Sequence, residues 1–320
     1  MRLCRMLHDD LPVAAFLTET HAVPVSTAAD SLGNAAHPVS LPARPDDLIA
    51  LLGQSAPARN ALHRLYRTCS DQPTSRLDAI GSPLGRARLL TPIERPPKLL
   101  LLAGNYAEHV KEDGSRAEER HDTFPYFFMK PSTTLLGPGA SFAIPASSPD
   151  AMDWEAELAV VIGRKTRNIA ETEALDCVAG YTLLNDLSDR RFRPNPGRRE
   201  RDWDKFFDWM HGKWHDGSAP CGPCLATSES VPDPQNLRLQ LTLNGELRQD
   251  GSTADQIFPV AAVISFISRL VTLEPGDIIS TGTPAGVGST TGTFLATGDI
   301  VEVSCPEIGT LTTPIAREIR

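Results

Sequence analysis

Two acidic side chains stand close together at the start of a strongly apolar segment. Glu155 and Glu157 lie in residues 153–163, which read Asp-Trp-Glu-Ala-Glu-Leu-Ala-Val-Val-Ile-Gly. Side chains two positions apart on a strand point to the same face, so both carboxylates would project together from a buried strand. Adjacent buried carboxylates repel each other unless they bind a cation or a proton. We therefore favour a metal site over a solvent-exposed strand end that carries two acids.

A third carboxylate follows a second apolar segment. Asp186 comes directly after residues 180–185, Gly-Tyr-Thr-Leu-Leu-Asn, and functional groups are often placed where strands end. Three carboxylates around one point suit a hard cation that takes oxygen ligands and keeps water molecules for exchange with substrate. The sequence thus predicts a site for Mg²⁺ or Mn²⁺, with Ca²⁺ as a further candidate.

A histidine and a glutamate occur three residues apart earlier in the chain. His109 and Glu112 would share one face of a short helix, where the carboxylate can orient the imidazole and stabilise its charged form. Taken alone, such a pair is most simply a surface salt bridge.

Several motifs in one order carry a family resemblance. They occupy residues 104–112, 128–132, 153–163, 180–188, 212–213, 244–245 and 275–288. In this order they resemble the fumarylacetoacetate hydrolase family, in its acylpyruvase-like and 2-oxohepta-3-ene-1,7-dioate-type branch. The resemblance covers residues 98–310, whereas residues 1–75 match only loosely.

The resemblance implies a role for each matching residue. Glu155, Glu157 and Asp186 would be the metal ligands, and His109 with Glu112 would activate water. The residues implied to contact substrate are Lys130, Arg190, Lys213 and Thr283. The implied reaction is hydrolysis of a carbon–carbon bond in an acylpyruvate or 2,4-dioxo acid, with the metal holding the 2-oxo carboxylate end.

Other activities remain open. A decarboxylase, isomerase or hydratase of a 2-oxo acid would use the same metal and enolate without an attacking water. A non-catalytic scaffold that binds metal and ligand is a rival of another class, although the His109–Glu112 pair argues against it because binding needs no water activator.

The elements that must hold these residues are mainly strands. We expect strands at 98–103, 155–162, 180–185, 237–243, 277–281 and 300–303, a hairpin turn at Asn244-Gly245, and helices at 171–178 and 254–270. A further helix should follow Asp46 as its cap. Many strands and few helices predict an α+β, mainly β fold, and the resemblance implies a mixed β-roll. We divide the chain into a small N-terminal α+β domain (1–75), a linker (76–97) and a catalytic domain (98–320).

Composition narrows the partners. The net charge of −9 disfavours nucleic acid and anionic membranes as partners, because both select basic surfaces. No apolar run is long enough to span a bilayer, and the 6 scattered cysteines are typical of reduced thiols in the cytoplasm. Cys221-Gly222-Pro223-Cys224 matches a redox motif by spacing only, and we interpret it as coincidence in a loop. We expect a cytoplasmic enzyme for a small anionic acid, and the family default is a homodimer.

One basic segment contrasts with the acidic chain. Residues 190–201 contain Arg190, Arg191, Arg193, Arg198, Arg199 and Arg201. Because this segment follows Asp186 so closely, it could select a second anionic group on the substrate. A solvated basic loop or a dimer contact is an equally good interpretation.

Overall fold

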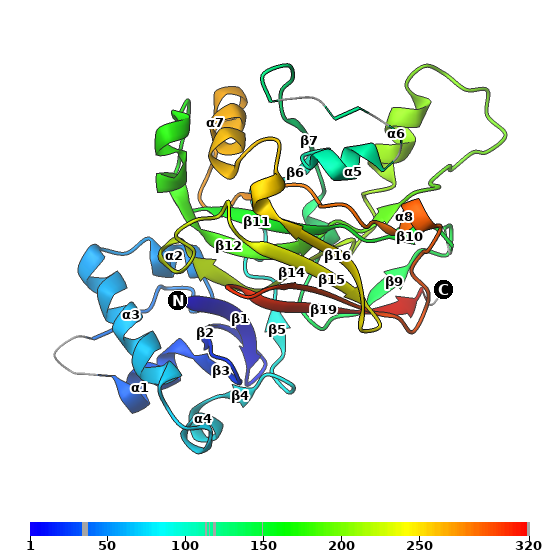
Figure 1. The fold of residues 1–320 in the computed structure, drawn as a ribbon. Coiled ribbons are helices and arrows are strands. Elements are labelled where there is room, and N and C mark those ends of the chain that lie inside the picture. Colours follow the sequence, from blue (N-terminus) through cyan, green and yellow to red (C-terminus); the bar gives the residue numbers. More distant parts are fainter. Residues whose placement is uncertain (34–37, 113, 115, 118–119, 149, 319–320) are drawn as a thin grey trace.

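The largest element of the fold is a long mixed sheet. The computed structural model describes the chain except residues 34–37, 113, 115, 118–119, 149 and 319–320. The described residues form a 12-stranded sheet in the order β4-β3-β2-β1-β14-β12-β11-β17-β6-β7, with β5 on β1 and β8 on β14 (Figure 1). Its strands are β1 (Arg2–His8), β2 (Leu11–Leu17), β3 (His21–Pro24), β4 (Ser82–Pro83), β5 (Leu89–Leu90), β6 (Leu99–Ala103), β7 (Tyr126–Met129), β8 (Leu135–Leu136), β11 (Ala156–Ile162), β12 (Val178–Asn185), β14 (Ala219–Thr227) and β17 (Ile278–Ser280).

A second, smaller sheet packs against the first. Its strand order is β16-β15-β18-β19-β9, and a separate pair joins β10 to β13. The strands are β9 (Phe142–Ile144), β10 (Met152–Asp153), β13 (Ser188–Asp189), β15 (Arg238–Leu243), β16 (Glu246–Ser252), β18 (Ile300–Cys305) and β19 (Gly309–Arg317). Parallel pairs (β17 with β6, β14 with β8, β19 with β9) occur among antiparallel ones. This arrangement confirms the expected mainly β, α+β class.

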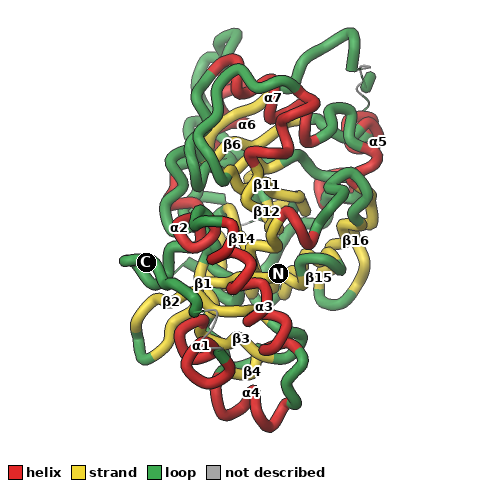
Figure 2. The backbone as a smooth tube through the Cα atoms, turned by 90° about the vertical axis from the view of Figure 1, so that its left-hand side faces the viewer, coloured by secondary structure: helices red, strands yellow, loops and turns green. Residues whose placement is uncertain are grey.

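Helices gather at two ends of the molecule. Helices α1, α3 and α4 lie beside β3 and β4, and helices α5, α6 and α7 lie beyond β6 at the other end (Figure 2). The helices are α1 (Val25–Leu32), α2 (Leu48–Leu52), α3 (Ala56–Ser70), α4 (Thr74–Ile80), α5 (Ala107–Lys111), α6 (Asp204–His211), α7 (Val260–Leu270) and α8 (Gly288–Thr291). Four 3₁₀ turns are described at Ser132–Thr134, Glu171–Cys177, Ser228–Ser230 and Thr253–Asp255.

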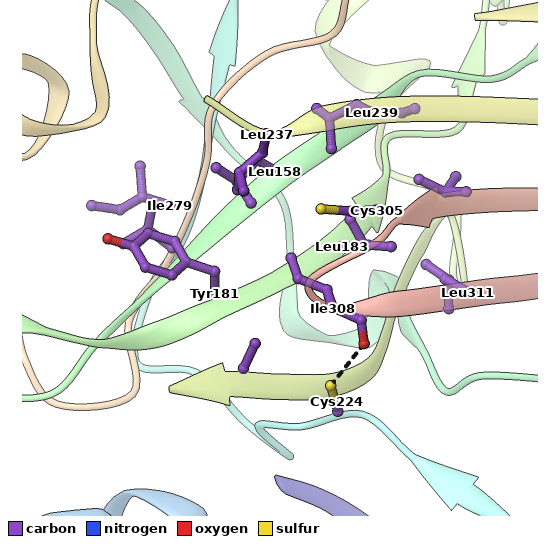
Figure 3. Close-up of a cluster of buried hydrophobic side chains, with 14 of the residues drawn as sticks. Leu158, Tyr181, Leu183, Cys224, Leu237, Leu239, Ile279, Cys305, Ile308 and Leu311 are labelled. Carbon is purple, nitrogen blue, oxygen red and sulfur yellow. Dashed lines mark hydrogen bonds between the residues drawn. The ribbon is translucent and has the colours of Figure 1, made fainter. Parts of the chain in front are cut away.

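Strand β11 is buried on both faces. Its even-numbered side chains, such as Leu158 and Val160, belong to a core shared with the smaller sheet. Figure 3 shows this core, where Leu158 and Leu183 face Leu239 and Leu311. The odd-numbered Ala159 and Val161 join a second core with residues of α1, α2 and α3. An apolar strand between two cores explains why the charged residues at its start are also shielded from water.

The β11–β12 pairing brings the acidic residues together. Ala156 pairs with Asn185, and the Asp186 N–H donates to the Glu155 carbonyl oxygen at 2.9 Å. Glu155 lies just before β11, and Glu157 is its second residue. The start of β11 therefore lies beside the end of β12.

Local sequence signals account for most element boundaries. The expected hairpin forms with Asn244 and Gly245 at φ 52° and 81°, as a two-residue turn requires. The expected helix at 254–270 is shorter, because Pro259 stands directly before α7 and the preceding residues form only a 3₁₀ turn. The expected helix at 171–178 is likewise a 3₁₀ turn. Asp47, not Asp46, caps α2, since its side chain accepts from the Ala50 N–H.

The N-terminal region shares the long sheet with the rest of the chain. Strand β1 pairs with β14, matching Arg2 to Ala226 and Leu3 to Leu225. The strands at 1–75 thus continue a sheet that the later residues complete, and the division into domains at 75 and 97 stays a prediction. Within the described residues, no helix is long and apolar enough to cross a membrane.

Candidate metal centre and active site

Three buried carboxylates meet at one point. Glu155, Glu157 and Asp186 each offer a carboxylate oxygen, and these oxygens lie within 4.8 Å of one another. All three residues are buried. The sequence prediction of a carboxylate cluster is therefore realised in the geometry, from the start of β11 and the end of β12.

Cationic side chains surround this acidic cluster. The Lys213 amino group lies 2.7 Å from both Glu155 Oε2 and Asp186 Oδ2. Arg190 contacts Glu155 Oε1 at 2.7 Å, and the Lys130 amino group donates to Asp186 Oδ1 at 2.7 Å. Coulomb attraction at such distances is strong in a buried site, so these cations offset much of the carboxylate charge.

The two glutamates respond oppositely to this environment. Burial would raise the pKa of Glu155, but the charges of Lys213 and Arg190 outweigh burial and lower it to about 2. Burial, reinforced by the charges of Asp186 and Glu155, raises the pKa of Glu157 well above its usual value. Of the two glutamates, Glu157 is therefore the one that takes up a proton more readily.

Glu157 also shows that a divalent cation fits the site. Its Oε2 accepts from the Gly282 N–H at 2.9 Å, whereas its Oε1 is buried and has no hydrogen-bond partner among the described residues. Buried polar atoms are nearly always satisfied. An unpartnered oxygen within an all-oxygen donor set is the chemistry that Mg²⁺ and Mn²⁺ accept.

Asp153 organises the approach to this cluster. Its Oδ1 accepts from the backbone N–H groups of Trp154 and Gly288, and its Oδ2 accepts from Ser289 N–H and from Arg190 Nε at 2.8 Å. Asp153 therefore fixes the guanidinium of Arg190 while holding the start of α8. Burial would lower the pKa of Arg190, but the charges of Glu155 and Asp153 raise it further above its usual range.

His109 and Glu112 pair as predicted, and Glu112 is held in turn by a residue that is distant in the sequence. His109 Nδ1 lies 2.8 Å from Glu112 Oε2. The other oxygen, Glu112 Oε1, accepts from the Gly286 N–H at 2.7 Å. Gly286 has φ 107°, and a Cβ there would lie 2.2 Å from the Arg248 carbonyl oxygen. Only glycine fits that close approach, so the turn that presents this N–H depends on it.

Thr283 is held by a buried amide. The Gln249 side chain donates to Thr283 Oγ1 at 2.8 Å and to the Pro284 carbonyl at 2.7 Å. Its Oε1 accepts from the N–H of Ala156, the residue between the two glutamates. Gln249 thus ties the Gly-Thr-Pro turn to the strand that carries the two glutamates. Because the Thr283 oxygen accepts from Gln249, its own proton is left to donate, and among the described residues its acceptor is the Pro284 carbonyl oxygen at a long 3.5 Å.

Several of these groups, though not Asp186, Asp153 or Gln249, line one cavity. A cavity of about 450 Å³ is lined on its polar side by His109, Glu112, Glu155, Glu157, Arg190, Lys213, Thr283, Ser289 and Thr290. Its volume lies in the range typical of small-molecule sites. The arrangement can bind a cation, hold an anionic group beside it, and present a carboxylate-oriented imidazole to the same space.

Lys130 has a different place from the one expected for a substrate contact. It is fully buried, and its amino group donates to Asp186, to the Leu187 carbonyl at 3.3 Å and to the Ser218 carbonyl at 2.8 Å. Burial lowers its pKa, although the charge of Asp186 opposes this. It is not among the residues that line the cavity. Lys130 therefore supports an acidic residue from behind.

The arginine-rich segment is mostly paired with nearby acids. Arg198 contacts Asp204 and Asp208, and Arg201 contacts Asp204. Arg193 contacts Glu200. Of the six arginines at 190–201, Arg190 alone lines the cavity. The structure thus favours a self-paired basic segment over a substrate selector.

The Cys-x-x-Cys spacing does not mark a redox centre. Cys221 and Cys224 lie within strand β14, where a loop was expected, and all 6 cysteines are buried and free. Burial raises the pKa of both Cys221 and Cys224 to about 12. A thiol with so high a pKa stays protonated near neutral pH, and a protonated thiol is a poor nucleophile.

Asp153, Gln249 and Gly286 were not singled out from the sequence. Asp153 carried a usable signal, because it is a third acid at the head of the same apolar segment. Gln249 carried none, since its partners Ala156 and Thr283 are 93 and 34 residues away.

Comparisons with known proteins agree with this geometry. The model of the family described as "Fumarylacetoacetate (FAA) hydrolase C-terminal" matches residues 98–316. A mitochondrial oxaloacetate tautomerase of Xenopus laevis is 36% identical over 245 residues, covering 75% of this chain and 73% of that protein. A 2,4-didehydro-3-deoxy-L-rhamnonate hydrolase of a Sphingomonas strain is 39% identical over 238 residues, covering 73% and 79%.

A solved structure adds a ligand-bound neighbour. Maleylpyruvate hydrolase from a Sphingobium strain, crystallised with manganese(II) and pyruvate, superimposes with a TM-score of 0.72 at 26% identity and covers 100% of each chain. The family model alone spans more than half of the present chain, and the acidic cluster lies within the matched region. The chain belongs to the fumarylacetoacetate hydrolase family.

Proposed function

We propose that this protein is a divalent-metal-dependent hydrolase that cleaves a carbon–carbon bond in an acylpyruvate or a related 2,4-dioxo carboxylic acid. One observation carries the proposal: the His109–Glu112 pair lines the same cavity as Glu155 and Glu157. A water-activating pair is required for hydrolysis and is superfluous for binding alone. Two relatives named as hydrolases of this kind of acid support the assignment.

The metal and its ligands define one end of the substrate. Mg²⁺ or Mn²⁺ bound by Glu155, Glu157 and Asp186 would supply Lewis acidity at the 2-oxo carboxylate end and stabilise negative charge that develops there. Lys213 and Arg190 keep two of these carboxylates in place and hold positive charge beside the same end. Thr283, whose oxygen already accepts from Gln249, is oriented to donate its proton to a substrate oxygen.

His109 performs the proton transfers. Its Nδ1–H donates to Glu112, which leaves Nε2 to take a proton from water as the water oxygen bonds to the 4-oxo carbon. Glu112 stabilises the resulting imidazolium and is itself fixed by the Gly286 N–H. The bond between carbons 3 and 4 then breaks, and its electron pair stays on carbon 3. That carbon takes up a proton, so the products are pyruvate and a carboxylic acid.

The direct test is product analysis with acetylpyruvate. The Mg²⁺-loaded protein should release pyruvate and acetate in equal amounts, and a chelator should stop this. His109→Asn should lower kcat by about 10²- to 10⁴-fold. His121→Asn is the matched control, because His121 is highly exposed and, among the residues that the structure describes, its recorded ion pair is with its neighbour Asp122. Failure of the wild-type protein to form pyruvate from any acylpyruvate would refute the proposal.

Tautomerisation is a second candidate. The oxaloacetate tautomerase from Xenopus laevis is the observation that favours it. That reaction moves one proton between carbon and oxygen and requires no attacking water. Decay of the enol absorbance of oxaloacetate, compared with pyruvate release from acetylpyruvate, separates the two activities. Wild-type protein that accelerates the enol decay but releases no pyruvate from acetylpyruvate is a tautomerase. Measuring the release of carbon dioxide from oxaloacetate in the same samples tests for decarboxylation.

A homodimer is proposed for the assembly. Strand β7 is an edge of the long sheet, and Trp203, directly before α6, is 70% exposed. A two-fold contact would cover this surface with the same surface of a second copy. Light scattering coupled to size exclusion measures the mass directly, and Trp203→Lys should shift it toward the monomer.

A further inference from the structure

The cavity also has an apolar side. Leu102 of β6, Trp209 of α6, and Ile257 and Phe258 before α7 line it, together with Phe124 and Tyr126 near β7. The Phe124 and Tyr126 rings meet edge to face with centroids 5.1 Å apart. Phe124 and Tyr126 nevertheless remain 55% and 60% exposed. Such exposure of adjacent aromatic rings at a site entrance is typical of a surface that binds an apolar group.

The apolar wall begins next to the acidic cluster. The Lys213 amino group, 2.7 Å from Glu155 and Asp186, also lies 5.8 Å from the centroid of the Trp209 ring. Trp209 packs edge to face on Phe128 at 5.1 Å between centroids. A substrate whose oxo-acid end lies at the carboxylates therefore meets an aromatic wall within a few bond lengths.

The cations that line the cavity are already engaged. Arg190 is held between Asp153 and Glu155, and Lys213 between Glu155 and Asp186. Among the described residues that line the cavity, Arg116 is the one other side chain with a permanent positive charge, and it is exposed to solvent. A carboxylate at the far end of the substrate would find no buried cation to replace its lost hydration.

A second hollow extends the apolar wall. It has a volume of about 470 Å³ and shares Ala103, Phe124, Tyr126 and Trp209 with the cavity. Its further walls include Phe127, Phe206, Phe266 and Leu270, and no charged residue lines it among those described. The apolar surface thus extends beyond the cavity, further than the single methyl group of an acetyl substrate would need.

We propose that the substrate carries an apolar acyl group, an alkyl chain or an aryl ring, which lies against Trp209, Phe124 and Tyr126 while the oxo-acid end occupies the carboxylate side. The inference rests on the proposed function for the position of the oxo-acid end. It distinguishes this chain from enzymes for dicarboxylic acids, because the far end of the substrate is recognised by burial of apolar surface.

Binding measurements test the inference without requiring turnover. Calorimetric titration of the Mg²⁺-loaded protein compares pyruvate, 2-oxobutanoate and 2-oxohexanoate with the dicarboxylate 2-oxoadipate. Each added methylene should tighten binding by about threefold, so that 2-oxohexanoate binds about 30-fold more tightly than pyruvate. 2-Oxoadipate should bind no more tightly than pyruvate. Tighter binding of 2-oxoadipate than of 2-oxohexanoate, or no dependence on chain length, overturns the inference.

Variants locate the tail on the wall. Phe124→Ala should remove most of the gain for 2-oxohexanoate and leave pyruvate binding unchanged. Phe207→Ala is the matched control, since Phe207 is 45% exposed and lines neither hollow. An unchanged chain-length dependence in Phe124→Ala contradicts the placement.

The two proposals fail separately. Pyruvate release from hexanoylpyruvate and from fumarylpyruvate, measured in parallel, reports hydrolysis independently of binding. If kcat/KM is higher for fumarylpyruvate than for hexanoylpyruvate, the proposal of an apolar acyl group is refuted and the proposed hydrolase activity is retained. If binding depends on chain length but no pyruvate is released from either substrate, the proposed hydrolase activity is refuted and the proposed apolar site is retained.

Discussion

Lys213 is the most informative residue to perturb, because it links two of the carboxylates directly. Its side chain is 4% exposed, and its amino group makes two contacts of 2.7 Å. Lys213→Met keeps an unbranched apolar stem and removes the charge. Glu155 and Asp186 would then each keep one cation, Arg190 and Lys130 respectively.

The expected cost follows from the loss of a buried counter-ion. Removing one partner of a buried ion pair typically destabilises a protein by about 3–5 kcal/mol. With the usual entropy of unfolding per residue, this lowers the melting temperature of a chain of this length by about 4–7 °C. The loss should appear in chelator and shrink when metal is added, because a divalent cation replaces the missing positive charge.

The assay is thermal denaturation in chelator and in saturating Mg²⁺. Lys98→Met is the control, since Lys98 pairs at 2.7 Å with the fully buried Asp277, which is not a member of the acidic cluster. Both variants should melt below the wild type in chelator, but added metal should restore Lys213→Met alone. The reasoning is refuted if Lys213→Met melts like the wild type in chelator, or if metal stabilises both variants equally.

Four further predictions concern protons, positioning and charge. Because the pKa of Glu157 is raised in the metal-free site, metal binding should release a proton, seen by calorimetry in buffers of different ionisation enthalpy and absent in Glu157→Gln. The pKa of Glu155 is lowered to about 2 from 4.5, so the stability it contributes is present above pH 4.5 and is lost as the pH falls toward 2; acid denaturation of Glu155→Gln should show a shallower loss. Gln249→Leu removes the Gln249 partner of three buried polar groups and should lower the free energy of unfolding by about 3 kcal/mol in chemical denaturation. Arg193→Gln should leave the KM for dioxo acids unchanged, and a rise in KM would return that arginine to the site.

Local patterns were enough to predict which candidate site residues lie side by side. Glu155 and Glu157 are two positions apart, and His109 and Glu112 are three apart, so each pair follows from the geometry of one strand or one helix turn. The continuous apolar run of β11 predicted its burial correctly. Prolines and glycines marked the turns, although the effect of Pro259 on the start of α7 was missed.

Contacts between distant segments escaped these patterns. The expectation that Lys130 contacts substrate was based on a motif. The direction in which its side chain points instead depends on its hydrogen bonds to Asp186, after β12, and to Ser218, before β14. The positive charge of residues 190–201 suggested an anion site, but acids of α6 pair with Arg198. A count of charges cannot reveal which partners lie within reach.

The sequence by itself predicted the carboxylate cluster and the strands that carry it, because spacing within one element decides which side chains share a face, whereas the role expected for His109 and Glu112 came from the family resemblance. Tertiary structure alone decided how the charges are balanced and which apolar side chains line the cavity beside them. Lys213 reaches Glu155 across 58 residues, and Glu112 reaches Gly286 across 174. The apolar wall likewise combines Trp209 of α6 with Phe124 near β7. Packing of separate elements sets such contacts, and no periodicity within a single segment encodes them.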